Sequence, residues 1–132
     1  MSALIAGHGV RRQFMAKYID RTLAGILIFG ACGHTLGSIK TYGDQPIVLL
    51  WALCASVLVA LLGALNLLRE RRRHDRALAW ITLAGTFCWL VSAIAFGWLI
   101  GNVFDVRIVV FALASAGLIG FGLQTALGRP IG

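Results

Sequence analysis

Residues 47–68 read IVLLWALCASVLVALLGALNLL, a stretch without a charged side chain. An α-helix rises about 1.5 Å per residue and the hydrocarbon core of a bilayer is about 30 Å thick, so roughly 20 apolar residues make one crossing. Three further runs free of Asp, Glu, Lys and Arg occupy residues 22–39, 77–100 and 108–127. We therefore predict four transmembrane helices over these four ranges.

The composition agrees with lipid as the solvent. The chain has 132 residues, of which 59% are hydrophobic, and its mean hydropathy is +0.86. A globule of this size leaves much of its surface in water and could not bury four helices that are apolar on every face. The predicted fold class is an all-α integral membrane protein, and a water-soluble domain is excluded.

The connections between the runs are short, at residues 40–46, 69–76 and 101–107. Connections of this length place successive helices side by side and antiparallel. The sequence thus predicts an up-down-up-down bundle of four transmembrane helices.

The segment ahead of the first run has a pattern of its own. Phe14 and Tyr18 recur at a spacing of four among basic residues, as in a short amphipathic helix on a membrane surface. We therefore divide the chain into a cytoplasmic basic amphipathic segment, residues 1–21, and a four-helix transmembrane domain, residues 22–132.

Positive charge is distributed unevenly among the loops. Of the 12 Lys and Arg residues, all but Lys40 and Arg107 lie before the first run, between the second and third runs, or after the fourth. Four crossings put those segments on one side of the membrane, and the positive-inside rule makes that side the cytoplasm. We expect a multi-pass protein of a bacterial-type cytoplasmic (inner) membrane with both termini in the cytoplasm.

The same basic residues bear on the expected partners. A net charge of +7 would suggest nucleic acid in a soluble protein, but here the charge borders the membrane and no nucleic-acid partner is predicted. The densest charged segment, residues 69–76, either only fixes the orientation or also binds anionic lipid headgroups or an acidic partner protein. The candidate residues for such binding are Arg11, Arg12, Arg69, Arg71, Arg72, Arg73 and Arg76.

His34 is the one ionisable side chain within the four runs, apart from cysteine thiols. An ionisable residue in a membrane is costly and needs a partner, so it is either a neutral histidine hydrogen-bonded between helices or a ligand-binding or proton-handling group. Ser38 lies one turn away on the same face, and Cys54, Ser92 and Ser115 lie at a similar depth as further candidate partners. We predict that His34 points into the bundle and contacts at least one of these serines.

A second polar layer is predicted toward the cytoplasmic ends of the helices. Asn66, Thr82 and Gln124 lie a few residues from the charged ends of their runs. Such side chains either join helices by hydrogen bonds or line a path for a ligand or ion.

Chemistry that needs clustered ligands or catalytic motifs is not predicted. Cys32, Cys54 and Cys88 all lie inside apolar runs without a CxxC pair, so we expect no disulfide and no metal site. A haem held by His34 would lack a second histidine or methionine at similar depth, and no cofactor is predicted. The runs contain no carboxylate, and no nucleotide-binding or hydrolase motif occurs, so a conventional enzyme is not expected.

Small residues are more frequent than polar ones in the runs, and Gly33 and Gly37 have the spacing that lets two helices approach closely. We therefore expect a small non-catalytic inner-membrane protein, a packing or accessory subunit of a homo-oligomer or larger membrane complex. The alternatives are a small transporter or channel with a polar path that includes His34, and a cofactor-binding redox subunit. A continuous hydrated cavity would favour the transporter, and a dry apolar middle around Trp89 would favour the subunit.

Overall fold

A computed structural model describes the backbone of residues 2–128 and the side chains of residue 11 and residues 13–128. Its helices are α1 (Ser2–Tyr42), α2 (Pro46–Arg71), α3 (Arg76–Leu99) and α4 (Val106–Ala126), and the described residues form no strand. All of α2, α3 and α4, and the Gln13–Tyr42 part of α1, are long and apolar enough to cross a membrane. The prediction of an all-α fold with four helices able to span a membrane is thereby confirmed.

Local sequence explains where the helices begin and end. Pro46 opens α2, where its missing N–H costs no hydrogen bond. The Asp75 carboxylate accepts a hydrogen bond from the backbone N–H of Leu78 at 2.9 Å and so caps α3. Gly101 follows α3 with a φ of 71°, a conformation that suits glycine.

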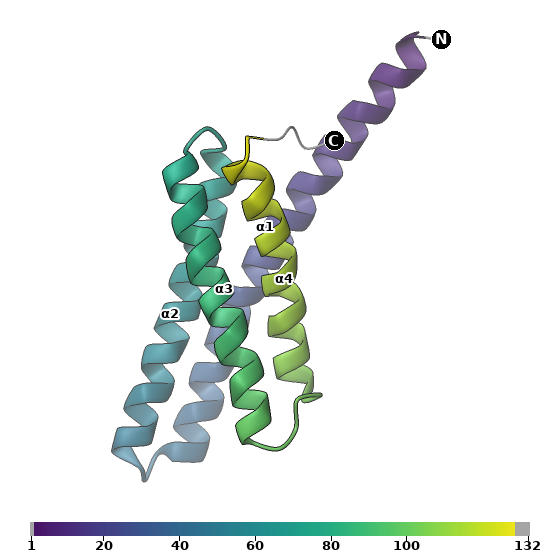
Figure 1. Cartoon of the computed structure of the whole chain (residues 1–132). Coiled ribbons are helices and arrows are strands. Elements are labelled where there is room, and N and C mark those ends of the chain that lie inside the picture. Colours follow the sequence, from purple (N-terminus) through teal and green to yellow (C-terminus); the bar gives the residue numbers. More distant parts are fainter. Residues whose placement is uncertain (1, 129–132) are drawn as a thin grey trace.

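The four helices form a bundle in which each has two main neighbours. α1 packs mainly on α2 and α4, and α3 packs mainly on α4 and α2, whereas the backbones of α1 and α3 do not approach each other closely in the described residues. Short connections join successive helices at alternating ends (Figure 1). Most close approaches between residues far apart in sequence therefore occur across these four neighbouring pairs, with a smaller contact between α2 and α4.

α1 is one continuous helix that crosses the expected boundary between residues 21 and 22. Its first part projects beyond the other three helices (Figure 1). The structure therefore does not set off a separate short helix ahead of the first span. A glycine costs a helix only about 1 kcal/mol, so Gly7 and Gly9 need not interrupt it.

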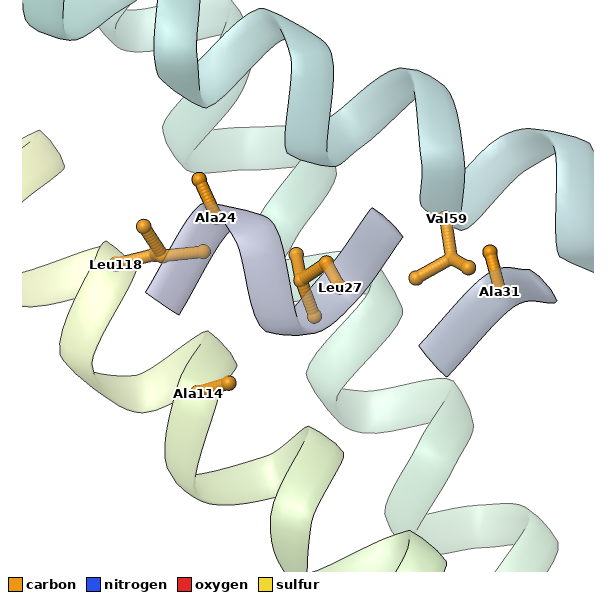
Figure 2. Close-up of a cluster of buried hydrophobic side chains, with 6 residues drawn as sticks. All are labelled: Ala24, Leu27, Ala31, Val59, Ala114 and Leu118. Carbon is orange, nitrogen blue, oxygen red and sulfur yellow. The ribbon is translucent and has the colours of Figure 1, made fainter. Parts of the chain in front are cut away.

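The centre of the bundle is filled by small and aliphatic side chains. Figure 2 shows this core cluster, in which α1 meets α2 on one side and α4 on the other. Its members are Ala24, Leu27, Ala31, Val59, Ala114 and Leu118. The helices approach closely there, because a methyl group placed on Gly63 of α2 would lie 2.9 Å from the Ala24 carbonyl oxygen.

Not all of the small residues are used inside the bundle. Gly30 lies against the ring of Phe111, so it is part of the contact between α1 and α4. Gly33 and Gly37 are exposed, and a methyl group on either would meet nothing within 4 Å. The Gly33–Gly37 face of α1 is thus directed away from the other helices.

Candidate functional site

A buried ion pair joins α1 to α2 near the connection between α2 and α3. Arg69 Nη2 donates to Asp20 Oδ1 at 2.6 Å, and the two side chains are 1% and 3% exposed. An isolated charge is very costly to bury, whereas a pair is tolerated when its other hydrogen-bonding groups are also satisfied. The remaining N–H donors of Arg69 therefore also need hydrogen-bond acceptors.

Thr125 of α4 and Asn66 of α2 itself supply partners. Arg69 Nη1 donates to the Thr125 hydroxyl at 3.2 Å and Arg69 Nε to the Asn66 amide oxygen at 3.3 Å. Asn66 in turn donates to the Thr86 hydroxyl at 3.0 Å. We name these five residues (Asp20, Asn66, Arg69, Thr86 and Thr125) the Asp20–Arg69 network, and it connects all four helices through buried side chains.

The next residues along both helices form a second ionic group with the signs reversed. Glu70 Oε2 accepts from Arg21 Nε at 2.9 Å, and Glu70 Oε1 accepts from Arg73 Nη2 at 3.3 Å. Lys17 Nζ lies 4.0 Å from the same carboxylate, whose side chain is 2% exposed. We name these four residues the Glu70 cluster. It holds three cations around one carboxylate.

His34 belongs to a neutral group between α1 and α2. Its Nδ1 lies 2.9 Å from the Ser56 hydroxyl and 3.4 Å from the Ser38 hydroxyl. Ser56 donates its own proton to the Ala52 carbonyl at 3.1 Å. The Ser56 oxygen must then accept from His34, which assigns the proton of the neutral ring to Nδ1. We name His34, Ser38 and Ser56 the His34 cluster.

The structure brings together only part of the site expected around His34. Ser38 is in contact with it, but Ser92 is exposed and donates to the Cys88 carbonyl of its own helix at 2.9 Å. Ser115 is fully buried, and its hydroxyl has no partner in the described part of the chain. The strongest partner, Ser56, was missed.

The second expected layer is also brought together only in part. Asn66 is a member of the Asp20–Arg69 network. Thr82 is buried and donates to the Ala79 carbonyl at 3.0 Å, whereas Gln124 is exposed. The charged centre of the network, formed by Asp20 and Arg69, lay outside the expected layer.

The basic residues considered for anionic partners have different environments. Arg69 is buried in the Asp20–Arg69 network, and Arg73 donates a hydrogen bond to Glu70. The remaining described candidates, Arg11, Arg71, Arg72 and Arg76, are exposed. The side chain of Arg12 lies outside the described residues.

An apolar layer separates the His34 cluster from the Asp20–Arg69 network. The α1 members of the core cluster in Figure 2 lie between Asp20 and His34 along the helix. Trp89 packs against this cluster from α3. The Trp89 ring meets Phe111 edge to face, with centroids 6.0 Å apart. Trp89 therefore points inward, although its indole N–H is buried without a partner among the described residues.

Metal-binding side chains do not converge in the described part of the molecule. The three cysteines lie exposed on helix surfaces, and no group of three or more His, Cys, Asp or Glu side chains is placed to share an ion. Several buried polar side chains instead bond to one another across helices.

No protein-family model, curated protein or solved structure matches the chain.

Proposed function

We propose that the protein is a non-catalytic packing or accessory subunit of a bacterial-type inner membrane, acting within a homo-oligomer or a larger membrane complex. Its four helices would cross the bilayer up, down, up and down, with both termini in the cytoplasm, as the distribution of arginines favours. The residues ahead of Arg21 would lie at the cytoplasmic surface.

The observation that carries this proposal is the unused Gly33–Gly37 face of α1. Both glycines have open space beside them, and exposed apolar side chains flank them, with Phe29 80% and Leu36 70% exposed. Helices in lipid associate largely through close packing, for which glycines one turn apart leave the backbone accessible. A second copy of α1, or a helix of another subunit, could approach closely here.

The interior of the bundle supports a packing role more than a transport role. The Asp20–Arg69 network bonds mainly within itself, and the core cluster and Trp89 separate it from the His34 cluster. A transporter or channel with a path through His34 would need a polar route across that layer. The separation of the two clusters favours the subunit over this alternative.

The proposal is tested by the mass of the protein purified in mild detergent. Gly33→Ile together with Gly37→Ile would fill the open face, and we expect the resulting protein to lose the homo-oligomer or the co-purifying subunit that the wild type retains. The matched control is Ala64→Ile with Ala84→Ile, which enlarges two exposed small residues on α2 and α3. A monomeric wild type without a partner, or an assembly that survives the double glycine substitution, would refute the proposal.

A further inference from the structure

A basic hollow of about 520 Å³ lies where the first part of α1 passes the end of α2. Lys17 and Arg21 line it from α1, and Arg71 and Arg73 line it from the end of α2 and the following turn. Glu70 contributes the one carboxylate of the lining. Four cations thus face one anion, so the hollow carries an excess of positive charge.

Glu70 fixes the positions of Arg21 and Arg73, but its single negative charge does not neutralise the four cations of the hollow. Arg21 uses its Nε and Arg73 its Nε and Nη2 to bond the Glu70 side chain and backbone, while each keeps further N–H donors outside those bonds. Arg71 makes no side-chain hydrogen bond to the described residues and is exposed. The buried carboxylate therefore acts as an anchor that holds basic groups in place for a second anion.

Phosphate is the anion whose chemistry suits this lining. A guanidinium presents donors in a planar fork that matches two oxygens of a phosphate, and an ammonium adds a mobile point charge. A volume of about 520 Å³ falls in the range of small-molecule sites, roughly 300–1,000 Å³, and exceeds what one phosphate ion fills. The hollow therefore has room for a phosphate together with the groups esterified to it.

The surroundings favour a lipid as the source of the phosphate. Phe14, 60% exposed, belongs to the lining, and Tyr18, one turn further along α1, is also exposed. Tyrosine is enriched at the membrane–water interface, where its ring lies at the level of the headgroups. Basic pockets beside transmembrane helices bind anionic headgroups on the cytoplasmic side.

We propose that the basic hollow between α1 and the end of α2 binds the phosphate headgroup of an anionic phospholipid, with Lys17, Arg21, Arg71 and Arg73 as the binding residues. This site does not depend on the proposed packing role, because the hollow involves neither Gly33 nor Gly37. It differs from a general attraction of the basic loop for membranes, since Arg72 in the same loop lies outside the lining.

The test uses the full chain in mild detergent, titrated with short-chain phosphatidylglycerol and followed by native mass spectrometry of the bound lipid. Lys17→Gln with Arg71→Gln removes two charges of the hollow and spares the two hydrogen-bonded partners of Glu70. The matched control, Arg11→Gln with Arg72→Gln, removes two exposed charges outside the lining. Each basic side chain near an anionic headgroup contributes about a fivefold gain in binding, so we expect binding to weaken about 25-fold in the first variant.

The expected result also includes binding within about threefold of wild type in the control, since a distant exposed charge is screened. Phosphatidylcholine of the same chain length and inorganic phosphate serve as comparison ligands, and both should bind much more weakly. Equal losses in the two double variants would overturn the site, because they would indicate diffuse attraction. Inorganic phosphate that binds as tightly as the lipid would overturn the lipid assignment. An unchanged melting temperature in each variant shows that the fold is kept.

Discussion

The Asp20–Arg69 network and the His34 cluster differ in charge and in the number of helices they join. The Asp20–Arg69 network contains a buried ion pair and connects four helices, whereas the His34 cluster is neutral and connects only α1 and α2. A buried charge that loses its partner remains buried and unpaired, but a neutral hydroxyl or imidazole loses only a modest hydrogen bond. The difference implies that substitutions in the Asp20–Arg69 network lower the free energy of unfolding far more than substitutions in the His34 cluster.

The largest effect is expected from Arg69→Met, which leaves the Asp20 carboxylate without its partner. Removing one member of a buried pair costs about 3–5 kcal/mol, and we expect the free energy of unfolding in detergent to fall by that amount. The double variant Asp20→Asn with Arg69→Met should recover most of the loss, because no unpaired charge remains. Thermal unfolding followed by circular dichroism measures both variants, and Arg72→Met is the exposed control. A loss below about 1 kcal/mol for the single variant would contradict the role of the pair.

A smaller loss is expected from Asn66→Ala, which removes the bond to Thr86 and one of the acceptors of Arg69. Leaving buried donors unsatisfied costs about 1–3 kcal/mol. Gln124→Ala, an exposed amide on α4, should change the unfolding free energy by no more than about 0.5 kcal/mol. Equal losses of unfolding free energy from Asn66→Ala and Gln124→Ala would contradict the role of Asn66 in the network.

The His34 cluster should respond more weakly. Ser56→Ala removes the main partner of His34, and hydrogen bonds between membrane helices contribute about 0.6 kcal/mol on average. Ser92→Ala is the control, since the hydroxyl of this exposed residue bonds only to its own helix. The same unfolding assay applies. A loss from Ser56→Ala as large as that from Arg69→Met would erase the contrast between the two groups.

The smallest effect is expected at the start of α4, where the partly exposed Asp105 carboxylate bonds to the exposed Arg107 side chain. Side-chain and backbone hydrogen bonds from Arg107 lower the pKa of Asp105 from 3.8 to about 2. A lowered pKa stabilises the fold above the unfolded value, and this contribution is lost as the pH falls from about 4 to about 2. Asp105→Asn should reduce the pH dependence of the melting temperature in that window. An identical pH profile for variant and wild type would contradict the effect.

The helices were predictable because length and apolarity alone determine what can cross a bilayer. The expected run over residues 47–68 lies inside α2, and the run over residues 77–100 departs from α3 by one residue at each end. The boundary at residue 22 was less informative. It followed from the charge of Arg21, yet α1 continues through it.

The charged part of the site could not be found by the same reasoning. Asp20 and Arg69 border apolar runs, so a reading based on charge assigns them to the aqueous ends, whereas the structure pairs and buries them. A signal was present in the opposite signs of the neighbouring pairs Asp20-Arg21 and Arg69-Glu70. Which face of α2 meets α1 decides whether such residues contact, and apolar runs without a polar stripe leave that rotation undetermined.

His34 contacts Ser38, as expected, and the same limit explains why Ser92 does not contact it and why Ser56 was missed. Depth along the helix placed Cys54 and Ser92 near it, but both are exposed, because side chains at one depth point in every direction around a helix. Ser56 lies two residues from Cys54 and hence on nearly the opposite face. Knowing which face of α2 is buried would have identified Ser56 as the partner.

The reversal of sign between neighbouring ion pairs has a consequence for how the first two helices find each other. If α1 turned so that Arg21 took the place of Asp20, the guanidinium groups of Arg21 and Arg69 would meet. Glu70 would also lose its strongest partner. Repulsion between like charges is severe where water is scarce. The two adjacent pairs therefore favour the one alignment of α1 and α2 in which both carboxylates are matched.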